Sequence, residues 1–551
     1  MLETGRLNPL PSRHRKVTSS TAQTLVPLAV SSSRTREIPV RIGSLRELQS
    51  LACIPYLGIL ASLQLIDPSV ANIALVKASD ALQMHGAVLA LGASVSTLAQ
   101  AASVLVMGFF GDRFGRRRVL AASLLLAVLG NLLSMLSSDP GLFLLGRALT
   151  GIALGSVLTS TFASVRFVTP AAGVSAALGL WNLLIVVGFI SGSLLGGWMA
   201  TIDWRLSFLL VPLICSASLL LLPALLPTIP GNRSLKPDIP GLASIAMAMV
   251  LFLYGINHAA LGLRNPSFWL PASSGLLLFV LHIFLERRSR KPMFPPRLYL
   301  RGFFAAAVIN GIGWNVAQAV VQLQTSNFWQ LVQGYSTSAV AMAQLPFLIC
   351  FGVAGIYAGR WMGPGRRTLV LMAGGSVALV LGLALFAIVQ VQTPYWQLLP
   401  ALMLSGLGLA FVAVPQSALF VQEAPKDCFG SVLAFRTTSG QLGFAFGLAA
   451  SGTMISGFGF HDLHSRMQAA GLGLEHLPQL DEQIRLFLRN SPISLDGSAS
   501  QQLLHLLREA YSQGLAGTML VVAVITGLLF AISLLLLIIG REQQLLHQEG
   551  S

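Results

Sequence analysis

The stretch Gly108-Phe-Phe-Gly-Asp112-Arg-Phe-Gly-Arg116-Arg-Arg-Val119 lies between two strongly apolar runs of the chain. It is a glycine-rich basic turn with four arginines and one aspartate, and it is too short to be a domain. Short loops rich in Lys and Arg are typical of the cytoplasmic side of membrane proteins. The turn therefore fits a protein in which the two flanking runs cross a bilayer and meet on that side.

The composition indicates a membrane protein. Apolar residues make up 54% of the 551 residues and charged residues only 10%, and the mean hydropathy is +0.73, whereas a soluble domain has about a quarter charged residues. The net charge of +15 is spread over short linkers without a continuous basic patch, so nucleic-acid binding is excluded.

Nothing in the sequence suggests catalysis. The four cysteines lie far apart, the nine histidines form no metal-ligand pattern, and there is no Gly-x-x-x-x-Gly-Lys-Ser/Thr loop for phosphate. We therefore expect no enzyme activity, no cofactor and no metal.

A helix needs about 20 apolar residues to cross the hydrocarbon core. We expect an all-α membrane protein with fourteen transmembrane helices. They cover 51–76, 86–110, 117–137, 141–165, 174–199, 205–227, 240–262, 268–285, 302–328, 338–359, 367–390, 395–420, 430–457 and 514–540.

Lysine and arginine set the orientation. They are concentrated in 1–50, 113–118, 287–301 and 360–367, which alternate with segments that carry few of them. This bias predicts that both termini are cytoplasmic.

Two segments lie outside the spans. We interpret 1–50 as a disordered basic cytoplasmic tail, with a transit peptide as the alternative. The long loop 458–513 is expected on the outer side, with short amphipathic helices at Leu480–Leu488 and Gln501–Tyr511 lying over the outer mouth.

An internal repeat divides the chain. The segment Gly355-Ile-Tyr-Ala-Gly359-Arg-Trp-Met-Gly363-Pro-Gly365-Arg-Arg367 is a degraded copy of the opening motif and again joins two spans on the inner side. Two related halves are typical of secondary transporters, whose substrate site lies between the repeats. The expected domains are the tail 1–50, a six-helix bundle 51–227, an inserted helix pair 228–301, a six-helix bundle 302–540 and a cytoplasmic tail 541–551.

Five motifs in order give a family resemblance. The opening motif is similar to the Gly-x-x-x-Asp-Arg-x-Gly-Arg-Arg signature between spans 2 and 3 of the major facilitator superfamily, at Gly108, Asp112, Arg113, Gly115, Arg116 and Arg117. Matches to its fourteen-helix drug:proton antiporter branch follow at Asp67-Pro-Ser-Val-Ala-Asn72, at Arg147 and Gly151, at Gly188, Gly192, Gly196 and Gly197, and at Trp204-Arg205. In the fourth motif Ser193 stands where the branch has proline.

The resemblance implies roles for these residues. The opening motif would hold the inner side of the N-terminal bundle closed through charge-assisted hydrogen bonds, although its arginines could merely follow the positive-inside rule. The glycines of span 5 would lie between the halves and favour antiport, or they could simply let helices approach closely. Arg147 would take part in proton movement.

Asp67 is the only acidic residue well inside a predicted span. An intramembrane carboxylate is a functional-site hypothesis by default, and low dielectric favours its protonated form. Asp67 is therefore a proton-coupling candidate, with pairing to Lys77 or Arg205 as the alternative. Glu423 is a third candidate that could titrate or pair with Arg436, and Arg436 could instead snorkel.

Asn315, Gln318 and Gln322 share one face of span 9. A polar face on a membrane helix points into a cavity or joins neighbouring helices. These amides are the substrate-cavity candidates, with interhelical contacts as the alternative.

We therefore expect a secondary transporter that exports amphipathic small molecules or drugs in exchange for protons by alternating access. It would be a monomer in the plasma (inner) membrane, and periplasmic and outer-membrane proteins are its candidate partners. The alternatives are an uptake symporter or uniporter on the same fold, or a membrane receptor or scaffold that does not transport.

Overall fold

Long helices make up nearly all of the chain that the computed structural model describes. The described residues are 45–84, 86–170, 173–235, 238–258, 265–288, 302–362, 366–423, 429–469 and 498–549. Within them, thirteen helices are long and apolar enough to cross a membrane, and Leu345–Trp361 is a shorter apolar helix. The prediction of an all-α protein with about fourteen spans is confirmed.

The first group of helices, here called the N half, packs around its own apolar cluster, in which Leu57, Leu124 and Leu154 are fully buried. Its main pairs are α2 with α4, α3 with α4, and α1 with α5. The N half consists of α1 (Leu45–Ala81), α2 (Gly86–Phe114), α3 (Arg116–Met135), α4 (Pro140–Val168), α5 (Val174–Ile202), α6 (Trp204–Ser207) and α7 (Leu210–Leu225).

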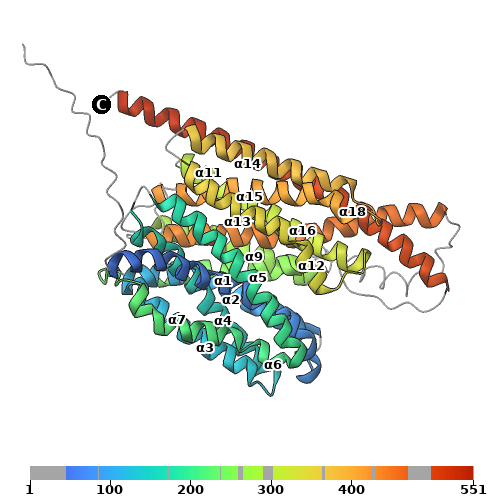
Figure 1. The fold of residues 1–551 in the computed structure, drawn as a ribbon, viewed down its shortest axis with the longest axis horizontal. Coiled ribbons are helices and arrows are strands. Elements are labelled where there is room, and N and C mark those ends of the chain that lie inside the picture. The colour runs from blue at the N-terminus through green and yellow to red at the C-terminus, as the bar shows by residue number, and fades with distance from the viewer. Residues whose placement is uncertain are drawn as a thin grey trace, which may run out of the picture. The chain divides into compact units, whose positions relative to one another are not determined.

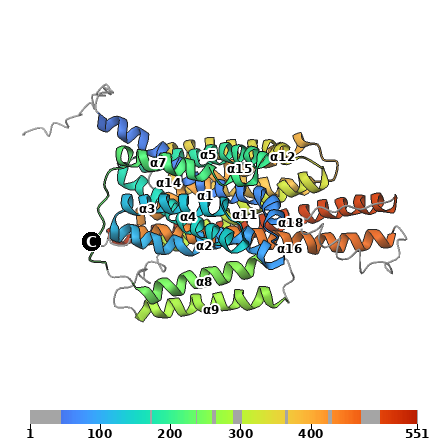
Figure 2. The same cartoon turned by 90° about the horizontal axis from the view of Figure 1, so that it is seen from below.

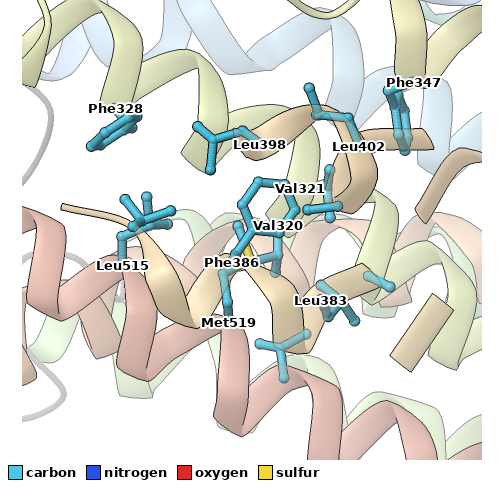
Figure 3. Packing of buried hydrophobic residues seen from close by; sticks show 14 of the residues in the cluster. Val320, Val321, Phe328, Phe347, Leu383, Phe386, Leu398, Leu402, Leu515 and Met519 are labelled. Atoms are coloured by element: carbon cyan, nitrogen blue, oxygen red, sulfur yellow. The ribbon is translucent and has the colours of Figure 1, made fainter. Parts of the chain in front are cut away.

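The second group, the C half, has its own core, in which Phe386, Val320 and Met519 pack together (Figure 3). Its main pairs are α14 with α15, α11 with α16 and with α18, and α13 with α15. The C half consists of α11 (Gly302–Asn327), the π-helix η3 (Phe328–Val332), α12 (Thr337–Ala343), α13 (Leu345–Trp361), α14 (Arg366–Leu385), the 3-10 helix η4 (Phe386–Ile388), α15 (Tyr395–Glu423), α16 (Phe429–Ala469) and α18 (Ser498–Glu549).

Between the halves in the chain come α8 (Ile239–Asn257) and α9 (Pro266–Arg288), which correspond to the predicted inserted pair. They pack on each other, and α8 also packs on α2 and α16. Figure 2 shows the pair running along one flank of the helices that surround α2.

Local sequence explains where several helices begin. Asp139 caps α4, its carboxylate accepting a hydrogen bond of 3.0 Å from the Leu142 N–H, and Pro140 stands at the first helical position. Asp238 caps α8 in the same way through the Gly241 N–H. An acceptor before the first turn satisfies an otherwise free N–H, and proline there loses no hydrogen bond.

Some predicted boundaries are wrong. Helix α1 begins at Leu45, so the last residues assigned to the tail 1–50 are helical. Helix α18 runs from Ser498 to Glu549, so Gln501–Tyr511 is the start of the last membrane helix, and most of 541–551 is its end. A helix can continue past its apolar span into polar residues. Hydrophobicity alone therefore does not show where α1 begins or where α18 begins and ends. The stretch Leu480–Leu488 lies outside the described residues, as does most of the tail.

The first turns of α18 also line a polar recess of about 410 Å³. The recess is also lined by Gln390 and Gln392. On α18, His505 Nδ1 lies 3.7 Å from Glu509 Oε1. The amphipathic pattern of 501–511 therefore reflects one apolar and one polar face of a long helix.

The N and C halves meet through α2 with α16 and through α5 with α13. Helices α5 and α13 are labelled close together near the middle of the ribbon in Figure 1. The contact involves the start of α5 and the end of α13: a Cβ placed on Gly179 would lie 2.5 Å from the Gly355 carbonyl oxygen. This is the end of the helices where α2 turns into α3, which we call the motif side. Near the same end, Phe304, Phe420 and Leu433 of the C half join the apolar cluster of the N half.

Candidate functional site

A buried ion pair joins α1 to α4 inside the N half. Arg147 donates from Nη1 to Asp67 Oδ1 at 2.9 Å and from Nη2 to Asp67 Oδ2 at 2.8 Å. Both side chains are 2% exposed. Two parallel bonds between a guanidinium and a carboxylate are the strongest geometry for such a pair. Two of the three proton-coupling candidates therefore form one unit.

The surroundings of the pair hold it in place. Ser96 of α2 donates to Asp67 Oδ2 at 3.3 Å, and the guanidinium of Arg147 lies 5.6 Å from the Phe208 ring. Pro68 follows Asp67 inside α1 and cannot donate a backbone hydrogen bond, so the helix is weakened beside the carboxylate. Ser96 carries no motif signal, and only the fold reveals its role.

The alternative partners of Asp67 are ruled out by their own contacts. Lys77 donates to the carbonyl oxygens of Ala200 and Thr201 at 2.9 and 3.3 Å. Arg205 donates to the carbonyl oxygens of Met135 and Ser137. Both cations thus bind helix and loop ends away from Asp67.

The opening motif Gly108–Val119, here called the gate motif, is almost entirely helical. The expected turn is reduced to Gly115, whose φ of 92° favours glycine. Asp112 and Arg116 form an ion pair one helical turn apart across this break. Arg116 is 1% exposed, whereas Arg117 has no ion-pair partner among the described residues.

The gate motif contacts the segment 229–235, which connects α7 to the inserted pair. The Arg113 guanidinium donates to the Leu235 carbonyl oxygen, and the Asn232 N–H donates to the Asp112 carbonyl oxygen at 2.7 Å. A Cβ at Gly115 would lie 2.7 Å from the Ile229 carbonyl oxygen. The sequence predicted that the motif can form hydrogen bonds. It did not predict that the segment 229–235 would be the partner. Gly108 is buried in α2.

The span 5 glycines lie at a different interface from the expected one. A Cβ at Gly192 would lie 2.6 Å from Ile66 of α1, and those at Gly188 and Gly196 would collide with Ser62 and Val70 of the same helix. The glycine face of α5 is therefore packed inside the N half, and the expectation that it lies between the halves is wrong. Gly197 has only an ordinary contact of 3.6 Å with Ile73.

The three amides of α11 have separate environments. Asn315 donates to the Gly311 carbonyl oxygen at 2.7 Å, one turn back on its own helix. The Gln322 carbonyl oxygen accepts a bond of 2.7 Å from the Gln344 side chain, and Gln318 is half-buried. Their role in substrate binding stays a prediction.

A buried amide network lies further along the same helix. Gln324 is fully buried, donates to Ser451 Oγ at 2.8 Å and accepts from the Tyr511 hydroxyl at 3.2 Å. It joins α11 to α16 and α18, so this glutamine acts as an interhelical contact. The sequence does not predict this contact, because its partners lie more than a hundred residues away.

Arg436 of α16 does not snorkel. Its Nη2 donates to Ser417 Oγ at 2.6 Å and its Nε to Gln416 Oε1 at 3.3 Å, both on α15. Its guanidinium carbon lies 4.5 Å from the centre of the Phe162 ring in the N half. The side chain of Glu423 lies outside the described part, so its proton-coupling role stays a prediction. Among the described residues, no group of three or more His, Cys, Asp or Glu side chains could hold a metal ion.

The helices define an all-helical membrane protein with a buried ion pair. Comparison with known proteins identifies its family. A sequence profile of the Major Facilitator Superfamily matches residues 57–448. The chain belongs to that superfamily, which consists of secondary transporters that move small molecules across membranes and are not enzymes.

Two relatives share about a quarter of their residues with this chain. The methylenomycin A resistance protein of Bacillus subtilis is 25% identical over 422 residues, which are 75% of this chain and 90% of that protein. The puromycin resistance protein of Streptomyces alboniger is 27% identical over 408 residues, 72% of this chain and 80% of that protein. A solved structure of a proton:xylose symporter has the same fold, with a TM-score of 0.55 and 13% identity over 88% of this chain and 95% of that one.

Proposed function

We propose that this transporter exports amphipathic small molecules in exchange for protons, as a member of the fourteen-helix drug:proton antiporter branch. The observation that carries the proposal is the buried pair between Asp67 and Arg147. Relatives named for resistance to methylenomycin A and puromycin support export of toxic compounds. We place the protein in the plasma membrane, with the motif side and both termini in the cytoplasm.

The chemistry of the pair suits proton coupling. The side chain of Asp67 is only 2% exposed, and its carboxylate is stabilised chiefly by its two bonds to Arg147. Protonation of Asp67 removes the charge that holds the guanidinium, and breaking a buried pair from one side costs about 3–5 kcal/mol. The two protonation states of Asp67 therefore favour different arrangements of α1 and α4.

A path of direct contacts leads from the pair to the other half. Asp67 lies on α1 beside Ile66, which packs against Gly192 of α5. The motif-side end of α5 in turn meets α13 where Gly179 faces Gly355. A shift of α1 on protonation would be passed to the contact that closes the motif side, which is how an ion can drive alternating access.

The test is proton-driven transport by the purified full chain in proteoliposomes. Substrate exchange should dissipate an imposed proton gradient, and Asp67→Asn should abolish this coupling while counterflow exchange of substrate persists. Asp80→Asn is the matched control, because Asp80 lies on the same helix and is exposed. Normal proton-linked transport by Asp67→Asn would rule out the assignment.

A folding control is needed because Asp67→Asn leaves Arg147 buried without its partner. The double variant Asp67→Asn/Arg147→Gln removes both charges and should fold. It should also lack proton coupling. Flux measured in inverted and right-side-out vesicles separates export from the alternative of uptake, and binding without exchange would indicate a receptor.

A further inference from the structure

Arg436 is half-buried and, unlike the buried Arg116 and Arg147, has no acidic partner among the described residues. Arg147 is paired with Asp67, and Arg116 with Asp112. Within the described part of the chain, Arg436 has only the neutral acceptors Ser417 and Gln416. A cation held inside a membrane protein without a countercharge is costly, and such residues mark substrate or ion pathways.

Its location is between the two halves. Arg436 belongs to α16, which packs on α11, α15 and α18 of the C half and on α2 and α4 of the N half. Its guanidinium lies over Phe162 of α4, and that ring is 5.4 Å from the indole of Trp181 on α5. In secondary transporters built from two repeats, the substrate pathway follows this boundary, with its central site near the midplane. Arg436 lies toward the motif-side end of the boundary, about two turns from the start of α16.

Two side chains that flank Phe162, Arg436 and Trp181, each have a hydrogen-bond donor without an acceptor in the described part of the chain. Ser417 and Gln416 occupy Nη2 and Nε of Arg436 and thereby orient the guanidinium, while Nη1 has no acceptor among the described residues. Trp181 is 3% exposed, and its Nε1–H also has no acceptor. Guanidinium and indole offer donors only, so a complementary ligand supplies acceptor oxygens, best of all charged ones.

We propose that Arg436 is the anion-binding residue of the substrate site, and that the transported molecules are amphipathic organic anions with an aromatic ring. Phe162 and Trp181 supply the aromatic surface, and Arg436 supplies the positive charge. A cationic substrate would need a free carboxylate, and the buried carboxylate of Asp67 is bound by Arg147. This inference rests on the proposed export function and adds the substrate class to it.

The test compares two fluorescent probes in proteoliposomes of the full chain under a proton gradient. One is an aromatic carboxylate dye such as carboxyfluorescein, and the other an aromatic cation such as ethidium. The wild type should transport the anionic probe in preference. Arg436→Gln should raise KM for the anion about tenfold to a hundredfold, because a hydrogen bond to a charged group is lost. Arg436→Lys keeps the positive charge and should bring KM part of the way back to the wild-type value.

Two further variants complete the design. Trp181→Phe keeps the ring but removes the N–H, and should raise KM for the anionic probe about fivefold; it also tests the site if Arg436→Gln fails to fold. Arg288→Gln is the matched control, since Arg288 is exposed on α9, and should change nothing.

The outcomes separate the two proposals. Proton-driven transport of the cation but not of the anion by the wild type would overturn the anion site and leave export intact. An equal loss of both probes in Arg436→Gln would assign the residue a structural role and also overturn it. If a proton gradient drives neither probe, the export function itself fails.

Discussion

The two halves use the same motif differently. In the N half the gate motif has Asp112, which pairs with the buried Arg116. In the degraded copy of the C half, Gly359 occupies the place of Asp112, and a Cβ there would collide with the Ser175 carbonyl oxygen of α5. One half thus uses a charge pair at this end and the other close backbone packing. Removal of a charge should therefore weaken the contact of the N half, whereas added side-chain volume should weaken that of the C half.

The largest expected effect comes from breaking the charged half. Asp112→Asn leaves Arg116, which is 1% exposed, without its ion-pair partner. We expect a loss of about 3 kcal/mol in the free energy of unfolding, measured by titration with SDS. Arg117→Gln, which removes a cation that has no such partner in the described residues, should change it by less than about 0.5 kcal/mol. Equal effects would show that the pair contributes nothing.

The second largest expected effect concerns the close packing of Gly359 in the C half. Gly359→Ala forces α5 and α13 apart, because the added carbon meets backbone, whereas Gly355→Ala meets the Gly179 carbonyl oxygen at an ordinary 3.8 Å. Overpacking of this kind costs about 1–3 kcal/mol, so the form closed on the motif side should become about tenfold less populated.

Spin labels can measure this shift. Phe167 and Trp361 are exposed at the motif-side ends of α4 and α13, and labels on Phe167→Cys and Trp361→Cys report the distance between the halves. Gly359→Ala should lengthen that distance and Gly355→Ala should not. The same distances in both would show that glycine is not required in the copy.

The smallest expected effect concerns the packing of α5 on α1 inside the N half. Gly192→Ala meets side-chain atoms of Ile66, which can move, so we expect a loss of about 1 kcal/mol. Gly197→Ala makes only a 3.6 Å contact with Ile73 and should be neutral. Thermal unfolding of the two variants measures this difference in stability. Greater destabilisation by Gly197→Ala would contradict the packing of α5 on α1.

Much of the architecture was predictable, because hydrophobic span length and basic loops are local properties. The spans, the inserted pair and the repeat at 355–367 follow from them, and both Asp67 and Arg147 stand out as charges in apolar helices. The pairing of Asp67 with Arg147 was not predictable, since the two residues are 80 positions apart and Lys77 is closer in sequence. The glycine face of α5 was assigned to the wrong neighbour for the same reason.

The sequence by itself determined the class of protein: apolar helices of membrane length, and charges allowed only at their ends or in rare buried positions, follow from the cost of placing polar groups in lipid. The tertiary structure alone decided which charges neutralise one another. Asp67 binds Arg147 and Asp112 binds Arg116, while the partners of Arg436 among the described residues are neutral side chains and an aromatic ring from the other half. Pairing depends on which helix faces come together, and helical periodicity within one segment carries no information about its neighbour.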